Sequence, residues 1–118
     1  MFHLSLPVEN FSACKEFYVR LFGAELIDLS ETCSNIFVFG GYVTLHDRAG
    51  SLLTDEVRKS MHFGEEVTLQ AWKERKEILD KNVVSYVFLQ EPDTIKGVRG
   101  KMVVKDPSGN LVEINSRL

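Results

Sequence analysis

The sequence is organised around one stretch, Asp106-Pro107-Ser108-Gly109-Asn110-Leu111-Val112-Glu113-Ile114-Asn115. Pro107 presets φ for a turn, Gly109 can take the positive φ that such a turn often needs, and Asp106 can hydrogen-bond the turn backbone. Side chains alternate along the strand that follows, so Glu113 points away from the face on which Val112 and Ile114 pack. Taken alone, such a glutamate is usually a solvated surface carboxylate.

Composition bounds the class of protein. The chain has 118 residues, of which 44% are hydrophobic and 26% are charged. This length suits one domain with its own core, so we expect a single domain over residues 1–118. The formal net charge of −3 gives no reason to expect nucleic acid or an anionic membrane as partner. We therefore expect a small molecule as the binding partner.

The sequence contains no pattern typical of a membrane span, a signal peptide or a paired-cysteine site. No apolar run approaches the roughly 20 residues of a membrane span, and no basic segment followed by an apolar one precedes the first strand. We expect a cytoplasmic protein. Cys14 and Cys33 form no C-x-x-C pair, which argues against a disulfide framework and against a thiolate zinc site.

The first part of the chain predicts a strand, a helix and three further strands. Asn10 is a good N-cap for the helix and Gly23 suits its C′ position. Gly40-Gly41 predicts a hairpin between the last two strands. The expected strands cover residues 1–8, 25–30, 35–39 and 42–47, and the helix covers residues 11–22.

The same pattern returns after a polar connector at about residues 48–60, in which nothing suggests chemistry. A strand begins at His62, Thr68 is a plausible N-cap, and a helix runs to about Lys81. Strands are then expected at 84–89, 101–105 and 111–115. The order βαβββ thus occurs in module 1 (about 1–47) and again in module 2 (about 61–118). We predict an α+β fold in which these modules form a curled mixed sheet around a metal-binding cleft.

Four side chains with metal-binding chemistry lie on the first or last strands of the two modules: His3 and His46 in module 1, and His62 and Glu113 in module 2. If those strands line the cleft, the four arrive from equivalent places. Imidazole and carboxylate suit divalent Fe, Ni, Zn, Mn or Co. Each histidine alone is more often an ordinary strand residue. The matched positions of all three predict a divalent metal site.

Such a site has a defined chemical use. Four protein ligands on an octahedral ion leave two adjacent positions for two neighbouring oxygens of one substrate. The cation then acts as a Lewis acid that lowers the pKa of a hydroxyl or an α-proton. Histidine must be neutral to bind, so with a reference pKa of about 6.5 the metal affinity falls in mild acid.

Three motifs of the sequence resemble the vicinal oxygen chelate superfamily, which includes glyoxalase I, the extradiol dioxygenases, and the bleomycin- and fosfomycin-resistance proteins. The motifs are His3-Leu4-Ser5-Leu6-Pro7-Val8-x-Asn10, Phe17-Tyr18 with Leu21-Phe22-Gly23, and Asp106-Pro107-Ser108-Gly109-Asn110-Leu111-Val112-Glu113. The resemblance implies the paired βαβββ fold, a homodimer, and a divalent metal held by His3, His62 and Glu113. His46 is a fourth ligand in glyoxalase-like members.

The resemblance leaves the reaction open. The set His3, His62 and Glu113 is that of the extradiol dioxygenases and implies Fe(II) and O₂. Adding His46 gives a site closer to glyoxalase I, a lyase, in which Glu113 can also move a proton at carbon. Typical glyoxalases carry Glu or Gln at positions where this chain has His. The alternative is a metal-free protein of the bleomycin-resistance type that sequesters a drug or metabolite.

Overall fold

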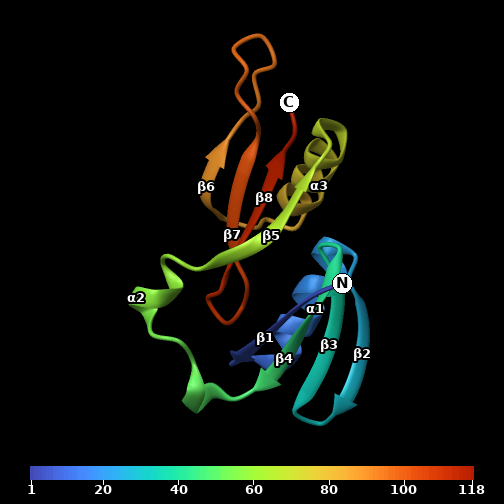
Figure 1. The fold of residues 1–118 in the computed structure, drawn as a ribbon, viewed down its shortest axis with the longest axis vertical. Helices are drawn as coiled ribbons and strands as arrows, with labels where there is room; N and C mark the ends of the chain where they lie inside the picture. The colour runs from blue at the N-terminus through green and yellow to red at the C-terminus, as the bar shows by residue number, and fades with distance from the viewer.

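The computed structural model describes all 118 residues, which form two four-stranded mixed sheets and three α-helices (Figure 1). The predicted α+β fold with two curled βαβββ modules is confirmed. The first module contains β1 (Phe2–Val8), α1 (Phe11–Phe22), β2 (Glu25–Ser30), β3 (Cys33–Val38) and β4 (Gly41–Asp47). The second contains β5 (His62–Val67), α3 (Leu69–Lys81), β6 (Tyr86–Gln90), β7 (Lys101–Lys105) and β8 (Leu111–Ser116).

Both modules have the same sheet topology. Sheet A has the strand order β1-β4-β3-β2, and sheet B has the order β5-β8-β7-β6. The first strand of each module runs parallel to its last strand, and the other pairs are antiparallel. Helix α1 packs on one face of sheet A and α3 on one face of sheet B (Figure 1). We call the opposite face of each sheet its open face.

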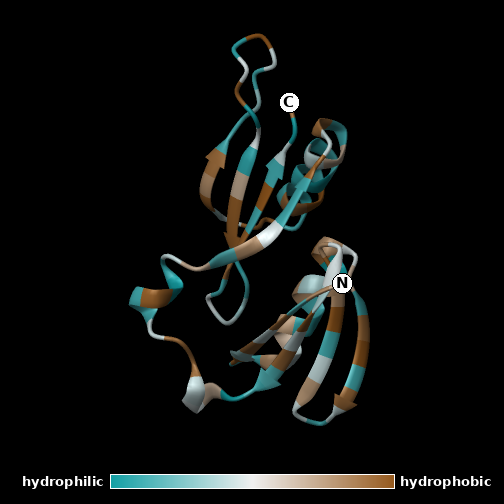
Figure 2. Cartoon of the chain, viewed as in Figure 1, coloured by the Kyte–Doolittle hydropathy of each residue, from teal (hydrophilic) through white to brown (hydrophobic).

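The hydrophobic core joins the two modules. Tyr18 and Leu45 of the first module and Trp72 and Ile114 of the second belong to one cluster of buried side chains. Helices α1 and α3 are in contact where the modules meet. Buried and half-buried residues alternate along β8, and the hydrophobic and hydrophilic residues of the strand appear as brown and teal bands in Figure 2. Each fully buried large apolar side chain contributes roughly 1.5–3 kcal/mol, so the shared cluster holds the modules together.

Helix α1 spans the predicted residues and Asn10 is its N-cap residue, as predicted, but the Asn10 side chain does not cap the helix. Asn10 has a φ of 53° and its side chain makes no capping hydrogen bond. Its Nδ2 instead donates to the Pro107 carbonyl oxygen at 3.1 Å. Asparagine tolerates this left-handed conformation better than most residues. The predictions for Gly23, with a φ of 68°, and for Thr68, whose Oγ1 accepts from the Ala71 N–H, are confirmed.

The hairpin between β3 and β4 is shifted by one residue from the prediction. The turn residues with positive φ are Phe39 (57°) and Gly40 (73°), which is the pattern of a type I′ turn. Gly41 is the first residue of β4, and a Cβ there would lie 2.3 Å from the Phe2 carbonyl oxygen. Gly41 therefore serves the close pairing of β1 with β4 rather than the turn.

The turn that precedes β8 is built around the carboxylate of Asp106, which is 4% exposed. Asp106 Oδ1 accepts the N–H groups of Ser108 and Asn110, both at 2.9 Å. Its Oδ2 accepts the Tyr18 hydroxyl at 2.7 Å and Asn110 Nδ2 at 3.1 Å. The Glu9 N–H donates to Ser108 Oγ at 3.0 Å. The turn before β8 is thereby attached both to the residue before the N-cap of α1, Glu9, and to the middle of that helix, at Tyr18.

The connector contains a short 3₁₀ helix, η1 (Ala49–Ser51), and the helix α2 (Asp55–Arg58). Thr54 caps α2, because its Oγ1 accepts the Val57 N–H at 3.3 Å. The connector runs along one side of the molecule between the two modules (Figure 1). None of the helices is long and apolar enough to cross a membrane.

Candidate functional site

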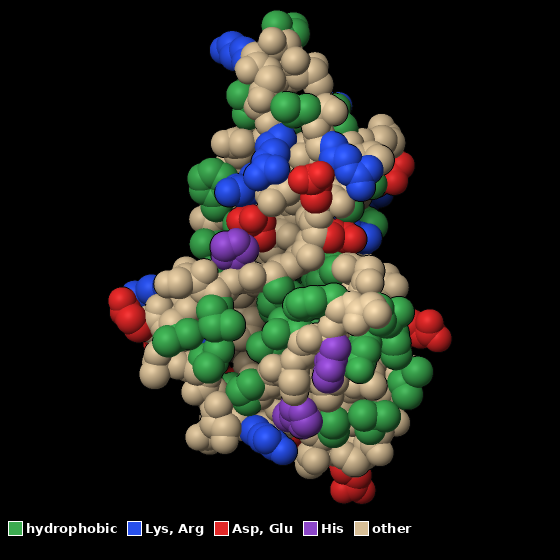
Figure 3. Space-filling model, viewed as in Figure 1, with side chains coloured by type: hydrophobic (Ala, Val, Ile, Leu, Met, Phe, Trp, Pro, Cys, Tyr) green, Lys and Arg blue, Asp and Glu red, His purple; other side chains and the backbone are tan.

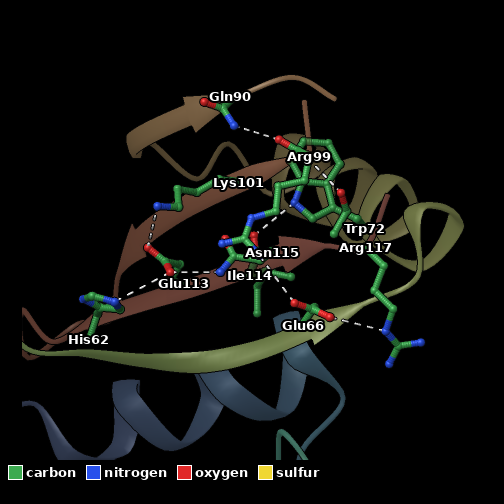
Figure 4. A network of polar contacts seen from close by, with 12 residues as sticks. His62, Glu66, Trp72, Gln90, Arg99, Lys101, Glu113, Ile114, Asn115 and Arg117 are labelled. Atoms are coloured by element: carbon green, nitrogen blue, oxygen red, sulfur yellow. Dashed lines mark hydrogen bonds and ion pairs between the residues drawn. The ribbon is translucent and has the colours of Figure 1, made fainter. Parts of the chain in front are cut away.

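His62 and Glu113 meet on the open face of sheet B. Strands β5 and β8 are parallel neighbours in which Gly64 pairs with Glu113. His62 lies two residues before Gly64 on the same face, and its Nε2 is 3.6 Å from Glu113 Oε2 (Figure 4). The His62 side chain is 49% exposed and that of Glu113 is 15% exposed. The structure thus brings together the two residues predicted from the second module.

Two further residues hold the Glu113 carboxylate (Figure 4). Asn115 Nδ2 donates to Glu113 Oε2 at 3.0 Å, and Lys101 Nζ is 3.7 Å from Glu113 Oε1. Neither Asn115 nor Lys101 was predicted as a site residue. Asn115 could have been found, since it shares a face with Glu113 by alternation. Lys101 could not, because its position beside Glu113 depends on the register of β7 against β8.

Gly64 allows β5 to lie close to β8 at this site, because it has no side chain. A Cβ on Gly64 would lie 1.8 Å from the Glu113 carbonyl oxygen. Real Cβ atoms do not come so close to a backbone oxygen, so any other residue would push the strands apart. The distance from His62 to Glu113 therefore depends on a glycine between them.

His3 and His46 lie on the open face of sheet A, but they do not meet. Strands β1 and β4 pair Ser5 with Thr44. His3 lies two residues before this pair and His46 two residues after it, which separates them by roughly 13 Å along the strands. His3 Nε2 is 2.9 Å from Thr44 Oγ1, and His46 Nε2 is 2.9 Å from Ser5 Oγ.

The register of the two sheets identifies equivalent positions. In sheet B the residue beside His62 is Glu113, and Glu113 pairs with Gly64, two residues after His62. In sheet A the residue two after His3 is Ser5, and Ser5 pairs with Thr44. Thr44 therefore occupies the position that corresponds to Glu113. The sequence analysis gave that position to His46, because alternation determines the face of a strand but not its register.

The hydrogen bonds around His3 determine which ring nitrogen carries the proton. Thr44 Oγ1 donates to Asn35 Oδ1 at 2.7 Å. A hydroxyl has one proton to donate, so Thr44 Oγ1 must accept from His3 Nε2–H. His3 Nδ1 then keeps its lone pair. The ring also stacks on Tyr42, with centroids 4.3 Å apart and planes at 11°.

The four predicted ligands do not form one cluster within the chain. No group of three His, Cys, Asp or Glu side chains lies close enough together to hold an ion. The histidines lie over both modules on the face of the molecule seen in Figure 3. Ligand distances of about 2.0–2.2 Å place two donors on one ion roughly 3 Å apart, and the 3.6 Å between His62 Nε2 and Glu113 Oε2 is near that value. Sheet B therefore brings two of the four predicted ligands close together.

Burial shifts two pKa values beside the Asp106 turn. Desolvation first, and then the charge of Asp106, raise the pKa of the Tyr18 hydroxyl well above its ordinary value. The same causes, in the same order, raise the pKa of the Cys14 thiol to about 12. Both groups therefore stay protonated at neutral pH. Neither lies on an open face, so we assign them to the packing of the modules rather than to chemistry.

Solved structures with the same fold cover nearly the whole chain at low sequence identity. A glyoxalase/bleomycin resistance protein/dioxygenase from Alicyclobacillus acidocaldarius has a TM-score of 0.77 and 20% identity, over 100% of this chain and 91% of that one. Lactoylglutathione lyase from Agrobacterium tumefaciens has a TM-score of 0.73 and 18% identity, over 98% and 92%. A genomically encoded fosfomycin resistance protein from Listeria monocytogenes has a TM-score of 0.78 and 18% identity, over 100% and 93%.

Sequence comparison identifies the family. No curated protein matches this chain. A family model for the Glyoxalase/Bleomycin resistance protein/Dioxygenase superfamily matches residues 1–114. That range contains both modules and all four predicted ligands, and it agrees with the fold of the solved structures. The chain therefore belongs to the glyoxalase/bleomycin resistance protein/dioxygenase superfamily.

Proposed function

We propose that the protein is a divalent-metal-dependent enzyme that acts on a small substrate through two adjacent oxygens. The observation that carries the proposal is the pair His62 and Glu113, with its 3.6 Å separation and a half-exposed imidazole. This pair presents two donors on an open face and lacks a third donor in its own chain. Members of the superfamily commonly use divalent metals and are often homodimers. We therefore propose that a second copy completes the site.

The strand register supports three protein ligands, namely His62 and Glu113 from one chain and His3 from the other. The fourth equivalent position is Thr44, whose hydroxyl already contacts His3 and Asn35. His46 lies two residues further along β4 and contacts Ser5. Two imidazoles and one carboxylate suit non-haem Fe(II) and leave more positions open for substrate and O₂. Dioxygenase-type chemistry is thus favoured over the four-ligand glyoxalase type.

The residues around the ligands would hold them for this role. A bound divalent ion supplies Lewis-acid chemistry that favours ionisation of a substrate hydroxyl or α-proton. The hydrogen bond from His3 Nε2–H to Thr44, and from Thr44 to Asn35, orients the ring so that Nδ1 is free to bind. Asn115 Nδ2 holds the Glu113 carboxylate through Oε2. Glu113 is also the carboxylate positioned to accept a proton from substrate.

Metal analysis tests the proposal directly. Protein purified without chelator is analysed for bound metal, and stripped protein is reconstituted anaerobically with Fe(II), Ni(II), Mn(II) or Zn(II). We expect about one ion for each His3, His62 and Glu113 set, and a dimer in solution. Absence of both bound metal and metal uptake would overturn the proposal.

The reaction is tested on the same reconstituted samples. Catechol cleavage is followed by oxygen consumption, and hemithioacetal isomerisation is followed by absorbance. Oxygen consumption that requires Fe(II) supports the dioxygenase type. Isomerisation with Ni(II) or Zn(II), without oxygen uptake, supports the glyoxalase type and would place His46 among the ligands.

A metal-free binding protein is the second candidate, and Lys101 favours it. Its Nζ lies 3.7 Å from Glu113 Oε1, so the carboxylate already has a cationic neighbour. A protein that only sequesters a small molecule would bind it equally well when His3 and His62 are replaced by Ala. A metal-dependent enzyme would lose its substrate with the metal.

A further inference from the structure

Two adjoining cavities lie between the connector and the end of sheet B where β8 begins. The larger has a volume of about 410 Å³, and the smaller about 140 Å³. Arg58 and Leu111 line both. The sequence analysis found no chemistry in the connector, yet its helix α2 forms a wall of both cavities.

The larger cavity is cationic. Arg58, Lys59 and Lys105 line it, and Asp55 is the one acidic residue among its lining. Asp55 pairs with Arg58 at 2.7 Å. Neither Lys59 nor Lys105 takes part in any ion pair of the chain. Two positive charges therefore face this space without a counter-charge.

Arg58 is held rigidly between the cavities. Its side chain is 16% exposed, Nη2 contacts Asp55, and Nη1 donates to the Ser108 carbonyl oxygen. The buried Nε has no hydrogen-bond partner. Gly109 makes room for the guanidinium, because a Cβ there would lie 3.0 Å from Nη1. The guanidinium is therefore fixed in place beside the cavity, where it contributes positive charge while its own hydrogen bonds are made within the protein.

The smaller cavity connects this cationic space to the predicted ligands. His62 lines it, together with apolar side chains of β1 and of the connector such as Leu4, Leu53 and Met61. His62 pairs with Leu111 across β5 and β8, and Leu111 pairs with Lys105 across β8 and β7. Both cavities therefore lie along the open face that carries Glu113.

We propose that the larger cavity binds an oxyanion, either a carboxylate or a phosphate-type group, through Arg58, Lys59 and Lys105. The volume suits a small ligand. The unpaired ammonium groups of Lys59 and Lys105 would bind such a group directly, and the charge of Arg58 would add to the positive potential of the cavity. The substrate is then amphipathic, with its anionic group in the larger cavity and an apolar part in the smaller one beside His62. This assignment of substrate class rests on the proposed function, whereas the anion site does not.

Anion titration of metal-free protein tests the site. Chelator-treated protein is titrated with inorganic phosphate at low ionic strength, and amide chemical shifts are followed by NMR. We expect saturable shifts centred on Gly109 and Leu111. The double variant Lys59→Ala/Lys105→Ala should bind phosphate at least tenfold more weakly. The double variant Lys73→Ala/Lys81→Ala removes the same charge from exposed positions of α3 and should change the affinity less than twofold.

A second titration tests the chemical class. Methylphosphonate, phenylphosphonate and benzoate are compared on the same protein. We expect phenylphosphonate to bind at least fivefold more tightly than methylphosphonate, because its ring can enter the smaller cavity. Benzoate binding that matches phenylphosphonate assigns the site to carboxylates, and much weaker benzoate binding assigns it to phosphate-type groups.

The outcomes separate this inference from the proposed function. Shifts spread evenly over basic residues, or equal weakening in the two double variants, would overturn the anion site. Metal uptake is measured on each sample as well. Localised phosphate binding without metal uptake supports the anion site and overturns the enzyme. Metal uptake without localised phosphate binding supports the proposed enzyme and overturns the anion site.

Discussion

The Tyr18 hydroxyl donates a 2.7 Å hydrogen bond to Asp106 Oδ2, joining the middle of α1 to the turn before β8. Both groups are buried. The bond links the two modules, because Tyr18 belongs to the first module and to the shared core, and Asp106 belongs to the turn before β8 in the second module. The turn motif that identifies the family by sequence is therefore also a contact between modules.

Replacing Tyr18 by Phe removes this contact without removing the ring from the core. A hydrogen bond to a charged group contributes about 1.5–3 kcal/mol, and we expect the free energy of unfolding to fall by that amount in urea titrations. Tyr42→Phe is the control, since the Tyr42 hydroxyl makes no hydrogen bond and its ring stays stacked on His3. Equal stability of the two variants would contradict the assigned role of Asp106.

Alkaline pH should destabilise the fold. Burial, followed by the charge of Asp106, raises the pKa of Cys14 from 9.0 to about 12, and raises that of Tyr18 well above 10.0. The unfolded chain then loses these protons at lower pH than the folded chain. Stability is therefore complete below about pH 9 and falls as the pH rises toward 12, by up to about 1.4 kcal/mol per pH unit for each group.

Cys14→Ala separates the two contributions to the alkaline loss. The variant should show a smaller loss of stability between pH 9 and pH 10, measured by urea titration at each pH, because the thiol no longer titrates in the unfolded chain. An unchanged slope in this interval would show that the Cys14 thiol does not cause it.

Metal affinity should distinguish His46 from the other predicted ligands. We expect His3→Ala, His62→Ala and Glu113→Ala each to weaken binding by roughly 100-fold or more, since loss of an outer contact alone costs about 10- to 100-fold. His46→Ala should weaken it less than threefold, because the register places Thr44 at the fourth position. Calorimetric titration with Zn(II) measures each. An effect of His46→Ala as large as that of His3→Ala would restore the four-ligand site.

Lys101 should oppose metal binding. Its Nζ lies 3.7 Å from Glu113 Oε1, so a divalent ion on that carboxylate is repelled by a partly exposed cation. For charges several ångströms apart near a surface this amounts to a factor of about ten in affinity. Lys101→Gln should therefore bind Zn(II) about tenfold more tightly at low salt. Lys96→Gln, in the loop between β6 and β7, makes the same charge change and should have little effect.

Gly64→Ala should be strongly destabilising. The added Cβ would lie 1.8 Å from the Glu113 carbonyl oxygen, which forces β5 away from β8. Such overpacking typically costs about 1–3 kcal/mol, and backbone clashes lie at the upper end. Gly50→Ala is the control, since its Cβ meets nothing within 4 Å. Thermal unfolding of the two variants side by side measures the difference.

The elements of the fold could be predicted because their determinants are local. Thr68 and Gly23 act at the ends of their own helices, and the alternation in β8 is visible in the sequence itself. The same local pattern gave Asn10 its correct N-cap position, but the side chain bonds the Pro107 carbonyl, 97 residues away, instead of the helix. A local pattern carries no information about such a distant competitor.

The candidate site could be predicted in part for the same reason. Alternation gave the correct face for His3, His62 and Glu113, although their role as ligands stays a prediction. The position of His46 relative to His3 depends on which residues of β1 and β4 pair, and this is determined by the intervening helix and hairpin rather than by either strand. The cationic cavity was missed because Lys59 follows α2 and Lys105 ends β7, and no sequence pattern places these two segments together.

The contacts of the Asp106 turn with α1 have a consequence for the order of synthesis. Glu9, Asn10 and Tyr18 are synthesised 88 to 99 residues before the groups they bind, which lie between Asp106 and Ser108. Domains tend to fold from the N-terminus as they emerge from the ribosome. Until the Asp106 turn is made, the Tyr18 hydroxyl of the first module lacks its partner, and the core shared with the second module is incomplete. Released chains that end before Asp106 should therefore be protease-sensitive in α1, and released chains that include all of β8 should be resistant.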